Sequence, residues 1–195
     1  NEMDILNQKQ VFEVMGSYKP DAVIHCAAYT NVDGAESDVE MAYKVNATGT
    51  QNVADACLKY DSKLVYISTD YVFDGKLGRP YNEFDTTNPQ SAYGKSKLAG
   101  ELLAKHILNR VYIVRTSWLY GDGNNFVRTM LRLGREKSEI SVVSDQHGCP
   151  TNTTDLAQAV LKLICTESYG VYHAANIGVT TWCEFARKIF ELSGN

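Results

Sequence analysis

The chain has 195 residues, of which 44% are hydrophobic and 22% charged, a balance typical of a globular domain with a buried core. Its formal net charge is −4 and it has no basic run, which argues against electrostatic binding of nucleic acid or of an anionic membrane surface. The five cysteines contain no C-x-x-C pair and the histidines share no ligand spacing, so we expect neither a disulfide framework nor a metal site.

Short apolar runs alternate with helical patterns through the first three quarters of the chain. The sequence predicts strands at 21–28, 63–73, 111–121 and 140–145. Between them it predicts helices at 39–60, from 92 onward and at 124–137. Strands that alternate with helices of this length indicate an α/β fold, with a Rossmann-like parallel sheet flanked by helices on both faces.

The pattern changes from residue 146. A helix is expected there with its N-cap at Thr153, Thr154 or Asp155, followed by a short strand within 170–178 and an amphipathic helix over 180–194. We expect 1–145 to form a partial Rossmann-like domain and 146–195 to begin a smaller lobe. No stretch approaches the ~18 apolar residues of a membrane span and no signal pattern opens the sequence, so we expect a soluble, cytoplasmic protein.

One helix carries a pair of residues with chemical meaning. Tyr93 and Lys97 are four residues apart, so a helix places them on one face. An ammonium beside a phenol favours the phenolate, and it should lower a phenol pKa that normally lies near ~10. We therefore expect Tyr93 to donate and accept a proton near neutral pH.

Polar and small residues collect where the predicted strands end. In parallel α/β sheets ligands bind at the carboxyl ends of the strands, and polar residues in buried strands are costly unless paired. A shared crevice at this edge of the sheet would explain the residues that follow the three strands: Ala27, Ala28 and Tyr29; Ser68, Thr69 and Asp70; Thr116, Ser117, Trp118 and Tyr120.

These residues carry a resemblance to a known family. Thr69, Tyr93 and Lys97 resemble the Ser/Thr and Tyr-x-x-x-Lys set of the extended short-chain dehydrogenase/reductases. Within that superfamily, four blocks in the same order resemble the dTDP-4-dehydrorhamnose reductase family: "STDYVFDG" (68–75), "PQSAYGKSKLAGE" (89–101), "RTSWLYGDGNNFV" (115–127) and "DQHGCPT" (145–151). A lone Tyr-x-x-x-Lys is a weak signal, whereas four linked blocks are a strong one.

The resemblance implies reduction of dTDP-4-dehydro-6-deoxy-L-mannose to dTDP-L-rhamnose with NADPH or NADH, for polysaccharide biosynthesis. Tyr93 would protonate the alkoxide that forms when hydride reaches the ketone. Lys97 would lower the pKa of Tyr93 and bind the cofactor ribose, and Thr69 would donate a second hydrogen bond to the substrate oxygen.

The resemblance also implies two groups of binding residues. Residues 1–145 would bind NAD(P) and 146–195 would contribute to the nucleotide-sugar site. On the cofactor side the family suggests Ala27, Ala28, Tyr29, Asn46 and Ser68 beside Tyr93 and Lys97. On the substrate side, together with Thr69, it suggests Trp118, Asn125, Phe126 and Gln146.

The sequence departs from the family in one respect. It has no glycine-rich fingerprint, and it opens on a segment that resembles the one after the family's third strand. The strand at 21–28 would then be an exposed apolar edge, a hazard for aggregation or swapping. We expect a chain that derives from a longer protein or associates through that edge as a homo-oligomer, and that binds a dinucleotide weakly on its own.

Two other functions stay open. One is a sugar-nucleotide dehydratase or epimerase on the same scaffold, but dehydratases place an acidic residue after the Thr-Asp pair, where this chain has Tyr71. The other is a non-catalytic subunit that resembles the beta subunit of methionine adenosyltransferase. Trp118 and the intact "GDGNNFV" block favour the enzyme, since a regulator would not need a sugar pocket.

Overall fold

The computed structural model describes residues 3–194 and divides them into two compact units. The first unit contains the residues up to Arg115 together with Val160–His173. The second contains Thr116–Ala159 together with the residues from Ala174 onward. The expected boundary after residue 145 does not coincide with this division, because the chain returns to the first unit after Ala159 and adds a strand to its sheet.

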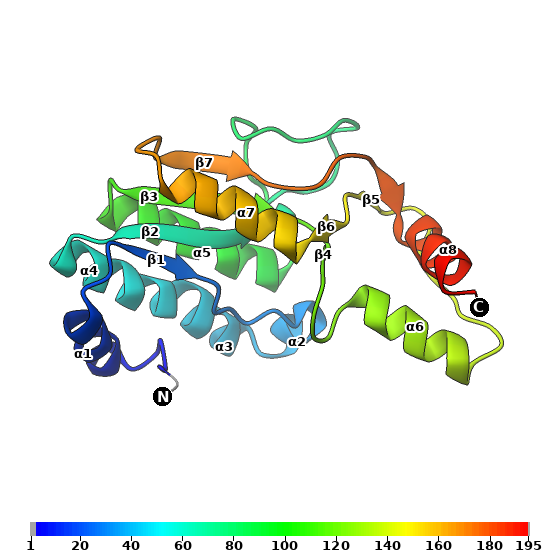
Figure 1. Cartoon of the computed structure of the whole chain (residues 1–195), viewed down its shortest axis with the longest axis horizontal. Coiled ribbons are helices and arrows are strands. Elements are labelled where there is room, and N and C mark those ends of the chain that lie inside the picture. The colour runs from blue at the N-terminus through cyan, green and yellow to red at the C-terminus, as the bar shows by residue number, and fades with distance from the viewer. Residues whose placement is uncertain (1–2, 195) are drawn as a thin grey trace. The chain divides into compact units, whose positions relative to one another are not determined.

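A four-stranded sheet forms the centre of the first unit. Its strand order is β1-β2-β3-β7, and the β1–β2 and β3–β7 pairs are parallel (Figure 1). The predicted strands of this unit are confirmed but shorter than expected: β1 (Ala22–His25), β2 (Lys63–Thr69), β3 (Val111–Thr116) and β7 (Gly170–His173). As expected, β1 is an edge strand, and the side chain of Ile24 on it is 43% exposed.

Helices cover both faces of this sheet (Figure 1). On one side lie α1 (Gln8–Tyr18), α4 (Thr50–Tyr60) and α5 (Ala92–Ile107), and the last turns of α7 (Thr153–Ile164) lie on the other. The short helices α2 (Val32–Ser37) and α3 (Val39–Tyr43) precede a π-helical segment, Lys44–Gly49, that runs into α4. The helix predicted at 39–60 is therefore confirmed as one helical run that widens in the middle.

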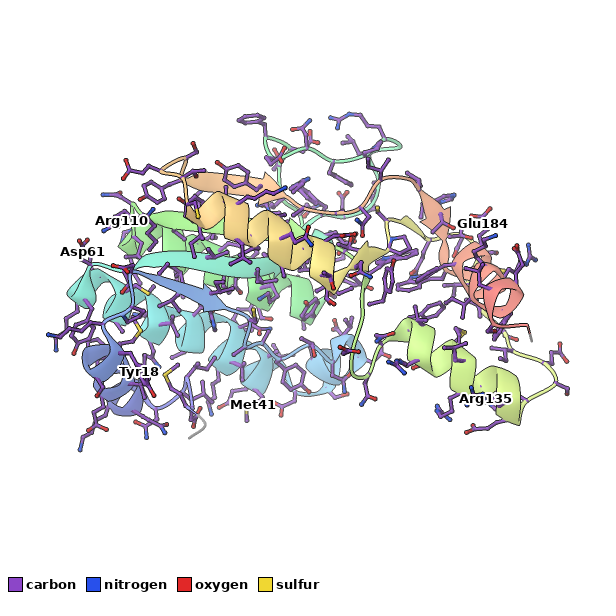
Figure 2. The ribbon with its side chains drawn as sticks, in the orientation of Figure 1. Tyr18, Met41, Asp61, Arg110, Arg135 and Glu184 are labelled. Carbon is purple, nitrogen blue, oxygen red and sulfur yellow. The ribbon has the colours of Figure 1, made fainter. Side chains whose placement is uncertain are left out.

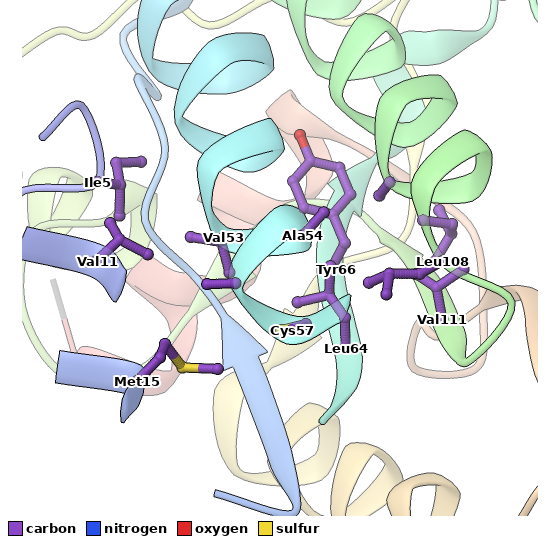
Figure 3. Close-up of a cluster of buried hydrophobic side chains, with 13 residues drawn as sticks. Ile5, Val11, Met15, Val53, Ala54, Cys57, Leu64, Tyr66, Leu108 and Val111 are labelled. Carbon is purple, nitrogen blue, oxygen red and sulfur yellow. The ribbon is translucent and has the colours of Figure 1, made fainter. Parts of the chain in front are cut away.

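The main hydrophobic core lies between the sheet and α1, α4 and α5. Figure 3 shows Val11 and Met15 of α1, Val53 of α4, and Leu64 and Tyr66 of β2 meeting in it. Tyr66 and Leu64 are fully buried. Burial of this apolar surface is the main driving force that holds the helices on the sheet.

The amino ends of the strands are fixed by the turns that precede them. Asp61 ends α4 in the left-handed conformation, with φ of 56°. Its carboxylate accepts a 2.6 Å hydrogen bond from Arg110, which precedes β3, and Figure 2 shows the two side chains together. This end of the sheet is thus closed by structural contacts, whereas its carboxyl end carries the reactive groups.

The second unit packs two helices face to face. Helices α6 (Phe126–Glu136) and α8 (Trp182–Ser193) bury Met130, Ala186 and Ile189 between them. Two short ladders complete this unit: β4 (Leu119–Tyr120) runs parallel to β6 (Thr151–Asn152), and β5 (His147–Gly148) is antiparallel to β8 (Thr180–Thr181). A capping box between Thr181 and Glu184 begins α8, the predicted last helix.

Three sequence expectations about the tail are wrong. Residues 140–145 form no strand, because their apolar side chains Ile140 and Val142 pack on the α6–α8 core instead. Asn152 caps α7, rather than Thr153, Thr154 or Asp155: its side-chain oxygen accepts from the amide of Thr154 at 2.8 Å. The strand within 170–178 is confirmed as β7, but it joins the main sheet and not a smaller lobe.

Two further observations concern membrane-spanning helices and the cysteines. Within residues 3–194, the structure has no helix that is both long and apolar enough to cross a membrane. The five cysteines all lie in the described part of the chain and are free thiols.

The close contact of α5 with the π-helical segment leads to a first prediction. A Cβ on Gly100 of α5 would lie 2.2 Å from the backbone oxygen of Asn46. Gly100→Ala should therefore destabilise the fold by about 1–3 kcal/mol, as overpacking does, although alanine in an exposed helix would gain about 1 kcal/mol. Urea unfolding followed by circular dichroism measures the change. Lys95→Ala, at an exposed position of the same helix, is the control, and equal midpoints for the two variants would contradict the close contact.

Candidate active site

Thr69 ends β2 and begins a tight turn at the carboxyl end of the sheet. Its side-chain oxygen accepts from the amide of Tyr71 at 3.2 Å and donates to the carboxylate of Asp70 at 3.1 Å. The residues Asp70–Val72 that follow form a single 3₁₀ turn. The hydroxyl is therefore held on a rigid strand end, which suits a fixed hydrogen-bond donor or acceptor.

Tyr93 lies in the first turn of α5. This helix begins there because the hydroxyl of Ser91 caps it and accepts from the amide of Gly94 at 3.0 Å. The half-buried ring of Tyr93 packs edge to face on Tyr71, with 5.6 Å between ring centres. The nearby side chain of Thr69 acts to lower the pKa of the phenol. The two predicted hydroxyls are thus brought together.

The electrostatics of Tyr93 differ from the sequence expectation. Burial, with the neighbouring Asp70 and Tyr71 acting in the same direction, raises the pKa of its phenol to about 12. The expected lowering by Lys97 is wrong, because the ammonium points elsewhere: Lys97 Nζ donates to the carbonyl of Ile67 at 2.7 Å. At neutral pH Tyr93 is therefore a protonated phenol, which is a proton donor and not an acceptor.

Lys97 is almost completely buried, with 2% exposure. Its Nζ lies 4.0 Å from the centre of the Tyr66 ring as well as on the Ile67 carbonyl. Burial lowers the pKa of this ammonium to about 7, whereas the charges of Glu101 and Cys26 act in the opposite direction. Lys97 is thus balanced between its charged and neutral forms near physiological pH.

Asp70 belongs to this cluster, although the sequence alone assigned it no role. Burial raises the pKa of its carboxyl to about 6, against hydrogen bonds from Thr69 and from nearby amides that lower it. Its charge in turn raises the pKa of Tyr93. A signal was present in the sequence, since Asp70 follows Thr69 at the end of a buried strand.

A buried ion pair lies below the cluster and was also missed. Glu101 accepts from Arg115 through both carboxylate oxygens, at 3.0 and 2.7 Å, and from Ser68 at 2.5 Å. The hydroxyl of Ser68, a predicted cofactor contact, is therefore directed into the interior. The sequence contained a signal for Glu101. Glu101 follows Lys97 by one helical turn, just as Lys97 follows Tyr93.

Asn46 connects the end of β1 to α5. It is fully buried in the π-helical segment, a kind of distortion that is frequent at functional sites. Its side-chain oxygen accepts a hydrogen bond from the backbone N–H of Tyr29 at 2.8 Å. Its side-chain nitrogen donates to the carbonyl of Tyr29 at 3.2 Å and to the hydroxyl of Ser96 at 2.9 Å. Ser96 donates in turn to the carbonyl of Tyr93 at 2.8 Å. Asn46 thereby holds the loop after β1 beside the start of α5.

The second unit holds the other predicted substrate residues. Trp118 is half-buried and has a left-handed backbone with φ of 47°, which is strained for a bulky residue. Its indole stacks on Trp182 with 3.6 Å between ring centres, and Phe126 lies 4.5 Å from Trp182. Trp182 lies in the helix predicted over 180–194, where sequence analysis gave it no individual role.

The remaining two predicted residues of this unit have different surroundings. Asn125 is the N-cap of α6: its oxygen accepts from the amide of Arg128 at 3.1 Å. Its amide nitrogen donates to the carbonyls of Gly121 and Gly123, so the whole side chain serves the turn. Gln146 is exposed.

The fold and this cluster of hydroxyl, phenol and ammonium groups define a class, the Rossmann-like α/β proteins of the reductase and epimerase type. Within it, the chain belongs to the RmlD substrate binding domain family, which it matches over residues 1–195.

Individual relatives agree with this assignment. The spore coat polysaccharide biosynthesis protein SpsK of Bacillus subtilis is 46% identical over 193 residues, 98% of this chain and 68% of the relative. The dTDP-4-dehydrorhamnose reductase of Aggregatibacter actinomycetemcomitans is 43% identical over 198 residues, 98% of this chain and 67% of that protein. The chain therefore spans about two thirds of the length of these relatives.

A solved structure is similar as well. The crystal structure of dTDP-4-dehydrorhamnose reductase from Bacillus anthracis, in complex with NADP, superposes with a TM-score of 0.96 at 52% identity. The match covers 98% of this chain and 69% of that one.

The raised pKa of Asp70 makes a second prediction, on stability. A carboxyl whose pKa rises from 3.8 to about 6 on folding favours the folded state at low pH, and this contribution is lost as the pH rises through 6. Asp70→Asn should therefore raise the melting temperature more at pH 7.5 than at pH 4.5, measured by calorimetry. Asp145→Asn, at an exposed loop position, should shift it equally at both pH values. A pH-independent effect of Asp70→Asn would contradict the burial of this charge.

Proposed function

We propose that this chain is part of an NAD(P)-dependent reductase that converts dTDP-4-dehydro-6-deoxy-L-mannose to dTDP-L-rhamnose for polysaccharide biosynthesis. One observation carries the proposal: the side chain of Thr69, at the carboxyl end of β2, lies close to the phenol of Tyr93 on α5, one helical turn from Lys97. The similarity to named dTDP-4-dehydrorhamnose reductases supports the choice of substrate.

The chemistry follows from the state of these groups. Reduction of a ketone makes an alkoxide, which is a far stronger base than a phenolate and therefore takes the proton of a phenol. Tyr93, with a pKa raised to about 12, is protonated before the reaction and transfers its proton as negative charge develops on the sugar oxygen. Thr69 supplies a second, prepositioned hydroxyl to the same oxygen. The pair thus stabilises the transition state more than the neutral ketone.

The residues after β1 fit a dinucleotide cofactor. Ala27 is exposed and Ala28 is half-buried, so small side chains leave this backbone open to a ligand, while Asn46 fixes the backbone of Tyr29. NADPH or NADH, when bound, supplies the hydride. We assign the cofactor to the set predicted from the family: Ala27, Ala28, Tyr29, Asn46, Ser68, Tyr93 and Lys97.

We assign the nucleotide sugar to Thr69 and to Trp118, Asn125, Phe126 and Gln146. Of the second-unit residues, Trp118 is the strongest candidate. Its half-buried indole offers an apolar surface of the kind that packs on a deoxysugar ring, and its strained backbone is typical of functional positions. Asn125 is the weakest, since its side chain is used by the turn that begins α6.

The dehydratase and epimerase alternative is less well supported. Tyr71 follows the Thr69–Asp70 pair, and its aromatic ring, which packs on Tyr93, provides no carboxylate base at that position. Asp70 itself is half protonated near pH 6, yet its carboxylate accepts from Thr69 and is engaged in the turn.

The proposal includes a cytoplasmic location and a homo-oligomer. Five free thiols are typical of a reducing compartment. The exposed apolar side chain of Ile24 on the edge strand β1 supports association between copies of this chain.

A third prediction tests the reaction. In the longest gene product that carries this sequence, Tyr93→Phe should reduce the rate of keto-sugar reduction by about 10²–10⁴-fold, because the ring stays but the proton donor is lost. Loss of NADPH absorbance with freshly generated keto sugar measures the rate. Tyr18→Phe is the matched control, since this tyrosine is 81% exposed on α1. Full activity of Tyr93→Phe would exclude the assigned acid, and an inactive parent protein would favour a regulatory subunit.

A fourth prediction concerns association. Ile24→Lys places a charge on the exposed edge of the sheet and should shift this chain toward monomer in sedimentation velocity at several concentrations. Leu58→Lys, at a 60% exposed position on α4, adds the same charge away from the edge and should leave the distribution unchanged. Identical distributions for both variants and the parent would contradict association through β1.

A further inference from the structure

Trp118 and Trp182, the two tryptophans of the sequence, form a stacked pair inside the second unit. Their ring centres are 3.6 Å apart and their planes are inclined by 11°, so Trp182 covers one face of the Trp118 indole. At this separation neither ring can leave its plane without colliding with the other, because the van der Waals contact is already complete. The pair therefore restricts the rotamer of Trp118.

Gly148 covers the other face of the same indole. A Cβ built on this glycine would have Cε2 of Trp118 as its nearest neighbour, followed by Cζ2 and Nε1. Since Cε2 is a ring-fusion atom with ring neighbours on either side, a group whose nearest atom is Cε2 approaches a face of the indole and not its rim. A Cβ between two rings 3.6 Å apart would touch both, yet the three nearest atoms all belong to Trp118. Gly148 thus lies on the side opposite Trp182.

One short ladder holds both of these contacts. Gly148 of β5 pairs with Thr180 of the antiparallel strand β8, and Trp182 follows β8 directly as the first residue of α8. The capping box at the start of α8 fixes this helix end, and Phe126 lies 4.5 Å from the Trp182 ring. The slot that receives Trp118 is therefore set by backbone hydrogen bonds and by the α6–α8 core.

The backbone of Trp118 is fixed independently of its ring. Its carbonyl accepts from the amide of Thr151 at 3.2 Å, and the hydroxyl of Ser117 donates to the carbonyl of Cys149 at 2.7 Å. Its φ of 47° is strained, and such a conformation persists only where the surrounding structure over-determines it. Contacts on both faces of the indole and on the backbone supply that constraint.

We propose that Trp182 is a positioning residue for the nucleotide sugar, and that together with Gly148 it holds the Trp118 indole so that the rim of the ring meets the ligand. This role rests on the proposed reductase function, which assigns Trp118 to the sugar. The rim carries apolar C–H groups and the indole N–H, and so it matches a deoxysugar, which carries a methyl group and hydroxyls. A side chain that is already immobile loses no rotamer freedom on binding, which is worth up to about tenfold in affinity.

A fifth prediction measures this immobility in the chain alone. The indole N–H of Trp118 should have an NMR order parameter near about 0.85, as rigid groups have, and Trp182→Leu should lower it below about 0.6. The signal assigns itself, because Trp182→Leu leaves a single tryptophan. Trp182→Phe keeps a ring on that face and should retain most of the rigidity. Phe185→Leu, which removes a ring 6.4 Å from Trp182 on the same helix, is the control and should change nothing. A rigid Trp118 in Trp182→Leu would overturn the inference.

Gly148→Ala tests the opposite face. Its added methyl group would meet the indole of Trp118, so it should displace the ring and shift the Trp118 N–H signal while Trp182 stays in place. An unshifted signal would contradict the contact between Gly148 and this face.

Kinetics separate the positioning role from the proposed reaction. In the longest gene product that carries this sequence, Trp182→Leu should raise KM for the keto sugar by about 3–10-fold and leave kcat and KM for NADPH close to the parent, because it weakens ground-state and transition-state binding equally. Trp182→Phe should restore most of the affinity, and Phe185→Leu should keep it. An unchanged KM for the sugar, or an equal rise for both substrates, would overturn the inference. An inactive parent protein would instead remove the proposed function, while the order parameter would still decide whether Trp182 immobilises Trp118.

Discussion

The close packing of α5 against the end of β2 and the π-helical segment is the constraint on which the site depends. It needs two glycines, because a side chain on Gly94 would meet the carbonyl of Tyr71 and one on Gly100 would meet that of Asn46. With these contacts made, the first turn of α5 brings Tyr93 to Thr69, and the second inserts Lys97 beneath the strand. The distance between helix and strand therefore determines the chemistry that the site can perform.

The same packing buries three ionisable side chains and shifts their pKa values. Burial alone pushes Tyr93 and Asp70 toward their protonated forms and Lys97 toward its neutral form. For a proton donor this is useful, since the phenol is fully protonated at rest. For Lys97 the same burial favours the neutral amine, and the nearby Glu101 acts against this lowering of the lysine pKa. The low polarity of the site thus keeps Tyr93 protonated before the reaction and brings Lys97 close to its neutral form at physiological pH.

Local patterns predicted much of the architecture but misplaced its ends. The strands β1, β2 and β3 and the helices α5, α6 and α8 were found because their apolar spacing matches the period of each element. Residues 140–145 are a short run with three β-branched apolar side chains, as in many strands, yet Ile140 and Val142 pack on α6 and α8 without a ladder. The strand β7 was expected in a smaller lobe, since four residues carry no information about which sheet they join.

By itself, the sequence determined which residues could react. Thr69, Tyr93 and Lys97 were identified from their spacing and surrounding blocks, because helix and strand geometry translate sequence spacing directly into shared faces. Only the tertiary structure decided how these groups ionise: Lys97 turns to Ile67 and Tyr93 becomes a weaker acid than expected. Contacts among β2, α5 and β3 also created the Ser68–Glu101–Arg115 network. The physical reason is that a pKa depends on burial and on charges brought close from distant parts of the chain, which no local pattern records.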